Sequence, residues 1–320
     1  MNAQSIGTPL RTAFLGTGDI AVPALEFLMR SEAVDVVCVV CQPDRPAGRG
    51  RGMKAPATKL AAAAGGIPIL QPEKLRAPEE VALLAGFAPD LAVVMAYGQL
   101  LPRTVLDIPR LGCWNLHASL LPQYRGASPL HAAIAAGDAQ SGVTVMWMDE
   151  GLDTGDILLK RELTLAENET AGSLHDRIGV LAAEALEDAL AALLRGEAAR
   201  QPQPVDGVSY ARKLSRESAR VDWSEPAAVI ERNIRACYPW PGAWTTLEVE
   251  EGPARVVKIV SARTIPCGSG TAGLPIAGDS GLSFHAGEEG IRLERIVPEG
   301  RREMSDVEFR RGVPTIIRAA

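Results

Sequence analysis

The sequence predicts two domains: a doubly wound α/β domain with a mostly parallel, Rossmann-like sheet, and a smaller β domain, either an OB-like β-barrel or a sandwich. Apolar runs alternate with amphipathic stretches through the first two thirds of the chain, which is typical of a parallel sheet with helices on both faces. The chain then becomes polar and carries prolines, and short alternating runs follow. We therefore assign the α/β domain to residues 1–197, a linker to 198–216 and the β domain to 217–320.

The strands of the α/β domain are predicted from short apolar runs, at 11–18, 34–42, 67–71, 90–98, 112–119 and 143–149. Its helices are predicted from the amphipathic stretches between them, at 22–32, 56–66, 78–88 and 128–138. A longer amphipathic stretch predicts a closing helix over 173–197. In the β domain, alternating runs separated by Gly and Pro predict strands at 244–251, 254–264, 281–287 and 290–300.

Composition and charge argue against a secreted protein, a membrane-spanning protein and a protein with an overall basic charge. The 320 residues are 47% hydrophobic and 22% charged, as in ordinary globular proteins. The net charge is −6, so a nucleic acid or an anionic membrane would have to meet a local basic patch. The N-terminus lacks the pattern of a secretory signal, and no run approaches the roughly 18 apolar residues of a membrane span. We expect a cytoplasmic monomer that does not bind membranes.

The five cysteines are scattered and odd in number, which favours reduced thiols over a disulfide framework. Cys38 and Cys41 form a C-x-x-C motif inside an apolar strand, where a spacing of three directs the two thiols to opposite faces. No second pair of Cys or His lies nearby. We therefore expect neither a metal site nor redox chemistry there.

Asn115 and His117 stand at the end of a predicted strand, just before a Ser-Leu-Leu-Pro turn. Because successive side chains of a strand point to opposite faces, these two polar side chains share one face. Ligands of open α/β sheets bind beyond the carboxyl ends of the strands, which makes this pair a candidate site. Taken alone, His117 also has an ordinary interpretation as a buried core histidine.

Asp153 is the third polar residue of interest, and Gly151 and Gly155 flank it. The two glycines allow the loop to bend sharply and bring a carboxylate close to another element. The alternative is a turn aspartate that caps its own backbone. The three other histidines have no acidic residue or Asn at a spacing that would indicate a shared catalytic site. We interpret them as structural: His131, His175 and His285.

The segment from Gly16 to Asp19 follows the first predicted strand and resembles the opening of a dinucleotide-binding fingerprint. Val22 stands where the third glycine of that fingerprint is expected. Gln42 and Pro43 stand at the end of the second strand, where an acidic residue would bind the ribose. We interpret the segment as a structural turn and expect no nicotinamide cofactor.

The stretch QPDRPAGRGRGMKAP, residues 42–56, concentrates positive charge in an acidic protein. Its four cations and one anion give a net charge of +3, against −6 for the chain. Most charged runs are solvated loops, but this contrast favours an anionic partner. The cations are Arg45, Arg49, Arg51 and Lys54, and the anion is Asp44.

Together these motifs resemble the methionyl-tRNA formyltransferase family over essentially the whole chain. The run NLHASLLP at 115–122, followed by Arg125-Gly126, is similar to the formyltransferase signature, and GLDTG around Asp153 is similar to its companion loop. Other folate-dependent formyltransferases share these two motifs. Three further stretches resemble the tRNA-acting branch more particularly: 42–50, 210–224 and 239–244. Gly18, Ile20 and Trp114 depart from the family's usual Pro, Phe and aliphatic residue.

The resemblance implies transfer of a formyl group from 10-formyltetrahydrofolate, a co-substrate, to the α-amino group of methionine on the initiator tRNA. In this reaction the amine attacks the formyl carbon, an oxyanion develops, and the attacking nitrogen loses a proton. Asn115 is suited to donate a hydrogen bond to the oxyanion, and His117 to stabilise the charge and move the proton. Asp153 would orient the imidazole. This chemistry needs no metal.

The resemblance also implies binding residues. Folate would lie along two segments, Ser119, Leu120, Leu121 and Pro122, and Tyr97, Gly98, Gln99 and Leu100. The tRNA would contact the basic stretch through Arg45, Arg49, Arg51 and Lys54.

Three alternatives stay open at this point. A formyltransferase acting on a small molecule, such as a purine ribonucleotide precursor or an amino sugar, would share Asn115, His117 and Asp153 but would not require the basic stretch. A non-catalytic RNA-binding protein on the same fold would have no reason to retain all three residues. A nicotinamide oxidoreductase is disfavoured by the incomplete fingerprint.

Overall fold

The computed structural model describes residues 9–47, 52–278, 281–313 and 315–320. The chain forms two compact units. The first consists of Met1–Gly126, Gln140–Thr164 and His175–Tyr210, and the second of Ala127–Ala139, Leu165–Leu174 and Ala211–Ala320. The chain therefore passes from one unit to the other several times, and each unit is described by itself.

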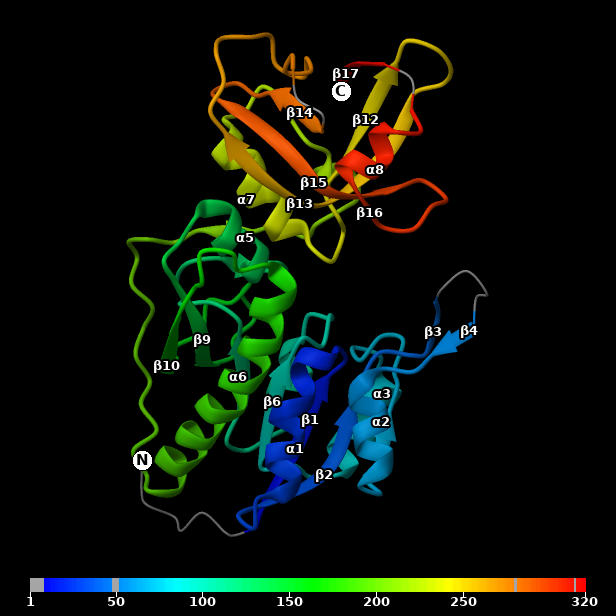
Figure 1. The fold of residues 1–320 in the computed structure, drawn as a ribbon. Helices are drawn as coiled ribbons and strands as arrows, with labels where there is room; N and C mark the ends of the chain where they lie inside the picture. The colour runs from blue at the N-terminus through cyan, green and yellow to red at the C-terminus, as the bar shows by residue number, and fades with distance from the viewer. Residues whose placement is uncertain (1–8, 48–51, 279–280, 314) are drawn as a thin grey trace. The chain divides into compact units, whose positions relative to one another are not determined.

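The first unit contains a sheet of seven strands in the order β10-β9-β7-β6-β1-β2-β5 (Figure 1). The strands are β1 (Leu10–Gly16), β2 (Val34–Val40), β5 (Ile69–Leu70), β6 (Leu91–Met95), β7 (Cys113–His117), β9 (Gln140–Trp147) and β10 (Ile157–Thr164). Five strands, from β5 to β7, pair in parallel, whereas β9 and β10 are antiparallel. The predicted mostly parallel sheet is confirmed.

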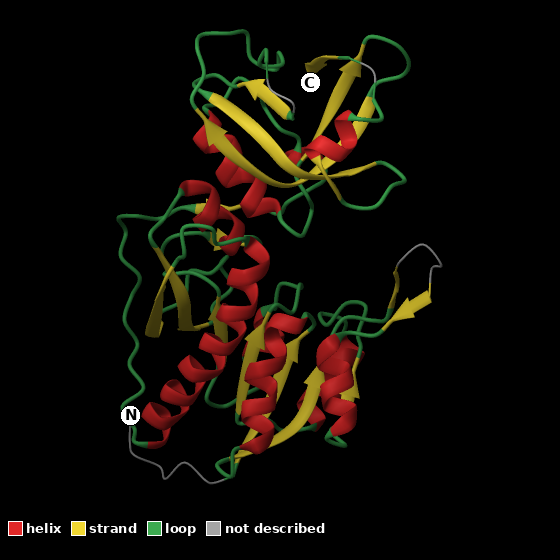
Figure 2. Ribbon diagram, viewed as in Figure 1, coloured by secondary structure: helices red, strands yellow, loops and turns green. Residues whose placement is uncertain are grey.

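Helices cover both faces of this sheet, as a doubly wound fold requires. They are α1 (Val22–Arg30), α2 (Ala57–Ala64), α3 (Pro78–Gly86), α4 (Arg103–Leu106) and α6 (Ala171–Leu194), with a 3-10 turn η1 (Asp19–Ala21) before α1. On one face, Leu15 of β1 shares a core cluster with Leu84 of α3 and Leu106 of α4. Phe14, the preceding residue of β1, points to the opposite face, where α1 and α2 stand side by side in front of the strands (Figure 2).

The turn after β1 is built on Gly16. A Cβ at this position would lie 2.7 Å from Cε1 of Phe14 and 2.9 Å from the carbonyl oxygen of Met95, so the backbone requires glycine here. The next residue, Thr17, donates a hydrogen bond to the carbonyl oxygen of Tyr97 and accepts one from the amide of Gln42. These contacts join the ends of three strand segments and support the interpretation of residues 16–19 as a structural turn.

The second unit contains an antiparallel sheet in the order β14-β15-β13-β12-β17, with β16 paired to β15, which curls into a nearly closed barrel (Figure 1). Its strands are β12 (Trp244–Val249), β13 (Arg255–Ile265), β14 (Leu282–His285), β15 (Gly290–Pro298), β16 (Met304–Ser305) and β17 (Ile316–Ala319). Its core contains Trp223 and Phe284, whose ring centroids lie 5.1 Å apart, together with Leu247 and Ile291. The predicted small β-barrel is confirmed.

Helices also contribute to the second unit. They are α5 (Pro129–Ala136), α7 (Ala227–Cys237) and α8 (Asp306–Arg310), with a 3-10 turn η2 (Glu217–Ala219).

Four short strands lie outside the two large sheets. They are β3 (Arg45–Ala47), β4 (Gly52–Lys54), β8 (Arg125–Gly126) and β11 (Tyr210–Ala211).

Several elements are not predicted from the sequence, among them β10 and α7. The strand β10 occupies residues for which the apolar runs predict no strand, and its alternating burial suits its place at the edge of the sheet. The helix α7 buries Ile230, Ile234 and Cys237 on one side, and this spacing, with charged residues on the other side, is itself the pattern of an amphipathic helix that the prediction missed. The strand β10 is held in the sheet by its antiparallel pairing with β9.

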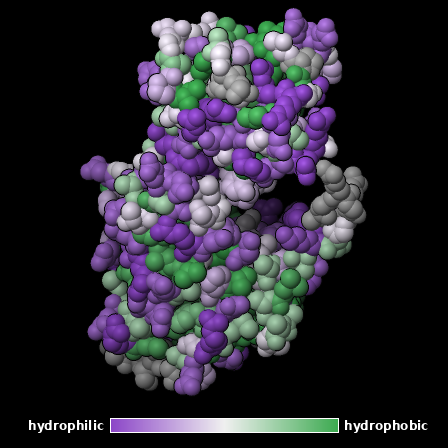
Figure 3. Space-filling view, viewed as in Figure 1, coloured by the Kyte–Doolittle hydropathy of each residue, from purple (hydrophilic) through white to green (hydrophobic). Residues whose placement is uncertain are grey.

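The surface in Figure 3 mixes hydrophilic residues with small apolar patches. The alanine-rich α2 contributes one such patch, and its Leu60 is 61% exposed. Among the helices that the structure describes, none has the length and apolarity needed to cross a lipid bilayer.

Candidate active site

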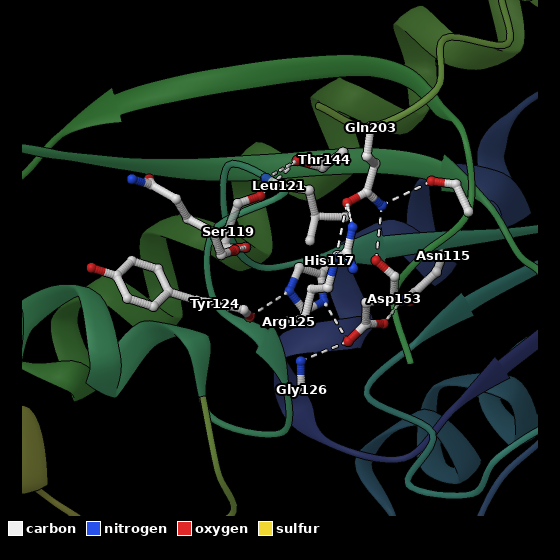
Figure 4. Close-up of polar contacts among 12 residues, drawn as sticks. Asn115, His117, Ser119, Leu121, Tyr124, Arg125, Gly126, Thr144, Asp153 and Gln203 are labelled. Atoms are coloured by element: carbon white, nitrogen blue, oxygen red, sulfur yellow. Dashed lines mark hydrogen bonds and ion pairs between the residues drawn. The ribbon is translucent and has the colours of Figure 1, made fainter. Parts of the chain in front are cut away.

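The carboxyl end of β7 carries the candidate site (Figure 4). This strand lies where the sheet changes from parallel to antiparallel pairing, between β6 and β9. Asn115 is paired in register with Met146 of β9, and His117 with Thr144. Leu116 lies between the two on the other side of the pleat and is buried. The strand therefore directs Asn115 and His117 to one face, as the alternation predicts.

Asp153 brings the three predicted side chains together. Its Oδ1 accepts a hydrogen bond from Nδ2 of Asn115 at 3.3 Å, and its Oδ2 lies 3.7 Å from Nδ1 of His117. The backbone amide of Gly126 donates to the same Oδ2 at 2.7 Å. One carboxylate thus contacts both residues of β7, although 36 residues separate it from His117 in the chain.

The loop around Asp153 has an unusual backbone. Asp153 has a φ of 53°, a left-handed conformation that Asp and Asn adopt more readily than most residues. At Gly155 a Cβ would overlap the carbonyl oxygen of Trp147, so no larger residue fits without movement of the loop. The Nε2 of Gln203 donates hydrogen bonds of 2.8 Å to the carbonyl oxygens of Asp153 and Gly155. The loop is therefore held by its close approach to Trp147 at Gly155 and by the two hydrogen bonds from Gln203.

The two ring nitrogens of His117 have different partners. Nε2 lies 3.0 Å from the carbonyl oxygen of Tyr124, and Nδ1 faces Asp153. A carbonyl oxygen only accepts, so Nε2 carries a hydrogen, and Nδ1 is the nitrogen that can exchange a proton. Tyr124 itself has a φ of 58°, and its amide donates to Oγ of Ser209 at 2.9 Å. His117 is 5% exposed, which limits the ring to these partners and to molecules that enter the site.

Four groups that complete this arrangement are not identified as site groups by the sequence: the amide of Gly126, the carbonyl of Tyr124, Gln203 and Ser209. Gly126 lies within the signature but carries no side chain to signal its role. Gln203 and Ser209 belong to the segment 198–216, the predicted linker. No local sequence pattern marks either of them, because their partners lie at least 48 residues away.

The first predicted folate segment, residues 119–122, follows β7 directly. Its side chains are largely buried, with Ser119 at 1% exposure and Leu121 at 0%. Several of its backbone groups already have protein partners: Thr144 Oγ1 accepts from the amide of Leu121 and donates to the carbonyl oxygen of Ser119, and Pro122 accepts from Ser209. The segment next to His117 is therefore held by hydrogen bonds within the protein, and its role in folate binding stays a prediction.

The second predicted folate segment, residues 97–100, follows β6. Tyr97 is 2% exposed, its hydroxyl has no hydrogen-bond partner in the described part of the chain, and burial raises its pKa. Gln99 accepts from the amide of Leu75 at 2.9 Å and donates to the carbonyl oxygens of Pro72 and Glu73. Leu100 is 79% exposed. These residues differ in exposure, and their role in folate binding also stays a prediction.

The basic stretch forms a hairpin, in which β3 pairs antiparallel with β4 and Arg45 stands opposite Lys54. Both of these side chains are exposed. Arg49 and Arg51, the two other predicted tRNA-binding residues, lie outside the described residues. The sequence does not predict the paired strands, because the glycines and charges of this stretch indicate a loop.

Asp44 anchors the base of this hairpin. Both of its carboxylate oxygens lie 2.8 Å from Nζ of Lys59 in α2, and Gln71 donates to Oδ1 at 2.8 Å. The hydrogen bond from Gln71, followed by that from Lys59, lowers the pKa of Asp44 below its ordinary value. The one acidic residue of the stretch is thus paired with a cation of α2, so the hairpin cations are not neutralised by it.

The remaining candidate groups of the sequence have structural surroundings. Burial raises the pKa of Cys38 to about 12 and that of Cys41 to about 11, so neither thiol ionises readily. No group of three or more His, Cys, Asp and Glu within the described ranges could hold a metal ion. Nε2 of His175 lies 3.2 Å from Oδ1 of Asp19, and its Nδ1 lies 3.0 Å from Oδ1 of Asp176. The spacing of these residues in the sequence does not indicate that they are partners.

Comparisons with known proteins find relatives of this chain over nearly its whole length. A family described as formyl transferase matches residues 10–190, and one described as formyl transferase, C-terminal domain, matches residues 213–314. The methionyl-tRNA formyltransferase of Xanthomonas axonopodis pv. citri is 43% identical over 312 residues, which cover 96% of this chain and 100% of the relative. That of Halorhodospira halophila is 46% identical over 303 residues, covering 94% and 96%.

A solved structure of HypX from Aquifex aeolicus in complex with tetrahydrofolic acid has the same fold over 96% of this chain, with a TM-score of 0.59 and 17% identity. The chain spans 49% of that protein.

Proposed function

This chain belongs to the methionyl-tRNA formyltransferase family, and we propose that Asn115, His117 and Asp153 carry out the formyl transfer that it catalyses. The enzyme transfers the formyl group of 10-formyltetrahydrofolate to the α-amino group of methionine on the initiator tRNA. The product is N-formylmethionyl-tRNA for translation initiation. The observation that supports the site is the carboxylate of Asp153, which contacts both Asn115 and His117.

The hydrogen-bond donors of the site are suited to the oxygen of a formyl group. Asn115 is half-buried, so its amide can reach a molecule above the sheet while one of its hydrogens stays directed at Asp153. A side-chain amide has two N–H donors, and the second is suited to the oxygen on which negative charge develops. 10-Formyltetrahydrofolate supplies the formyl carbon when bound.

His117 is the residue suited to move the proton. Its Nε2 is occupied by the carbonyl of Tyr124, so Nδ1 takes the proton that the amino group loses and can return it to the leaving nitrogen. Asp153 lies on the side of Nδ1 and stabilises the positive charge that forms on the ring. The separation of 3.7 Å leaves the proton free to exchange instead of fixing it in a short hydrogen bond.

Folate binding is assigned to two segments, Ser119–Pro122 and Tyr97–Leu100. The hydrogen-bonded backbone of the first segment would hold the donor beside His117. The hydroxyl of Tyr97 has no hydrogen-bond partner among the described residues, so it is a buried polar atom that a bound molecule can satisfy. These assignments rest on the motifs and on their place at the ends of β7 and β6.

The tRNA is assigned to the basic hairpin through Arg45, Arg49, Arg51 and Lys54. The exposure of Arg45 and Lys54 on adjacent strands supports this assignment, because phosphate contacts need accessible cations. We expect the enzyme to act as a monomer in the cytoplasm, and light scattering of the purified protein measures the first of these points.

One assay tests the acceptor most directly. The protein is incubated with 10-formyltetrahydrofolate and with charged initiator or elongator methionine tRNA, and formyl transfer is followed. We expect transfer to the initiator tRNA with a preference over the elongator tRNA. Parallel reactions with an amino sugar nucleotide and a purine ribonucleotide precursor are the controls, and transfer to either of them in preference to tRNA would refute the assigned acceptor.

A further inference from the structure

Gln203 occupies an unusual position in the segment that joins the two matched families. The residues on either side of it are exposed, including Gln201, Pro202, Pro204 and Val205, which is 90% exposed. Gln203 alone among them turns inward and is half-buried, with its side chain above the loop of Asp153 (Figure 4). A polar side chain that leaves solvent in such a segment requires partners that compensate its desolvation.

These partners satisfy the whole amide group. Nε2 donates to the carbonyl oxygens of Asp153 and Gly155, each at 2.8 Å, and Oε1 accepts from Nε and Nη2 of Arg125 at 3.1 and 2.7 Å. A guanidinium group only donates and a carbonyl oxygen only accepts, so the orientation of the amide is fixed by chemistry. Two donors and two acceptor sites are all used.

The two hydrogen bonds from Nε2 of Gln203 hold the part of the backbone that sets the direction of the Asp153 side chain. Asp153 is in the left-handed region at φ 53°, a conformation that persists in a non-glycine residue when its surroundings impose it. Gln203 clamps the carbonyl of this residue and the carbonyl two residues later. On the other side, Arg125 ties the clamp to the signature segment, whose next residue, Gly126, donates to the Asp153 carboxylate.

We propose that Gln203 is a positioning residue for formyl transfer, which holds the Asp153 loop in the conformation that directs the carboxylate at Asn115 and His117. The inference rests on the proposed function, since it assigns Gln203 an effect only through Asp153. Gln203 touches no reacting atom. It supplies no proton and no charge, and its contribution is the geometry of the loop.

Two substitutions separate the donor and acceptor halves of the amide. Gln203→Met keeps the length of the side chain and removes every hydrogen bond. Gln203→Glu keeps an acceptor for Arg125 and replaces the donor by an oxygen facing two carbonyl oxygens, so the segment stays tied while the loop is released. Gln201→Met is the matched control, because the side chain of Gln201 is exposed and the residue pairs with Ile157 through its backbone.

Both Gln203 variants are expected to lower kcat by about 10–100-fold, the usual consequence of misplacing a catalytic group by about 1 Å, with KM for tRNA and for folate changed less than about threefold. Gln201→Met should match the unsubstituted enzyme. If Gln203→Met does not fold, Gln203→Glu carries the test, because its ion pair with Arg125 keeps the segment in place. Normal kcat in the Gln203→Glu variant would overturn the proposal.

A double-mutant cycle distinguishes positioning from a general structural role. In an Asp153→Ala enzyme there is no carboxylate to position, so adding Gln203→Met should lower kcat less than about twofold further. An equal fractional loss in both backgrounds would show that Gln203 acts on the fold and would refute the inference. If Asp153→Ala itself leaves kcat unchanged, the proposed function of Asp153 fails; if it lowers kcat while Gln203→Met does not, only the role of Gln203 fails.

Discussion

At the scale of single residues, Asp153 shows how charge and backbone conformation are combined at one position. Its carboxylate oxygens contact three different groups, from Asn115, His117 and Gly126. Its backbone is left-handed, which restricts the residue types that can replace it without strain. A substitution that changes the charge but keeps the conformation therefore isolates the electrostatic part of its role.

Asp153→Asn is that substitution. Asparagine tolerates the left-handed region and keeps an oxygen for the amide of Gly126, but it loses the negative charge beside Nδ1 of His117. We expect kcat to fall by about 10²–10⁴-fold, the range for loss of a group that supports general acid–base catalysis. The thermal midpoint should be nearly unchanged. Turnover near that of the unsubstituted enzyme would show that the charge on Asp153 is not used.

The cysteines give a second test at the residue scale. Burial raises the pKa of four thiols, those of Cys38 and Cys113 to about 12 and those of Cys41 and Cys237 to about 11. A raised thiol pKa means that the reactive thiolate is scarce at a mildly alkaline pH of about 8. Cys267 is half-buried, and its Sγ lies 3.5 Å from Nδ1 of His285.

With a thiol reagent such as Ellman's reagent at about pH 8, the folded protein should therefore show one accessible thiol, that of Cys267. All five should react after unfolding in guanidinium chloride. Fast reaction of two or more thiols in the folded protein would contradict the described burial. A Cys267→Ser variant identifies which thiol reacts first.

At the scale of elements, the hairpin of β3 and β4 combines a fixed base with charged strands. Asp44 is bound by Lys59 and Gln71 at the base, while Arg45 and Lys54 are exposed. Although the protein is acidic overall, the hairpin thus offers a polyanion a segment in which cations are concentrated. Arg49 stands in the middle of that segment in the sequence.

Arg49→Ala is expected to weaken use of tRNA and to leave folate binding intact. If Arg49 contacts a phosphate, the slope of log affinity against log salt should flatten by about 0.7–0.9. If it reads base edges, the slope should hold while the preference for initiator over elongator tRNA falls. We expect the second result, since a guanidinium fork suits base-edge recognition.

Kinetics with both tRNAs at two salt concentrations distinguish these results. Arg30→Ala is the matched control, because Arg30 is an exposed arginine at the end of α1 that forms an ion pair with Glu26 of the same helix. Kinetics that are the same for Arg49→Ala and for the unsubstituted enzyme in every condition would show that Arg49 takes no part in tRNA recognition.

At the scale of the whole molecule, the parts of the fold that are predictable are those with a local pattern. The apolar runs around Phe14 and Leu91 are buried strands, and the alternation of apolar and polar residues in β7 is sufficient to place Asn115 and His117 on one face. The hairpin of β3 and β4 is not predicted, because its glycines and charges indicate a loop, whereas α7 carries a local helical pattern that the prediction missed.

The candidate site divides in the same way. Asn115, His117 and Asp153 carry functional groups within recognisable motifs, so the sequence is enough to find them. Gln203 cannot be found in this way, because its four hydrogen bonds reach residues 48 to 78 positions away and nothing near it in the chain signals them. Positioning groups of this kind are set by tertiary structure, and their residue types are common in linkers.

We propose that Asn115 and His117 act as one catalytic unit on the formyl group. The most direct measurement is the single-turnover rate of formyl transfer to initiator methionyl-tRNA by Asn115→Ala, His117→Ala and the double variant. We predict that each single variant loses about 10²–10⁴-fold, and that the double variant is little slower than the slower single one, because residues that act as a unit are not additive. A near-normal rate in the His117→Ala enzyme would remove His117 from the mechanism, and a double variant whose loss equals the product of the single losses would show that the two residues act independently.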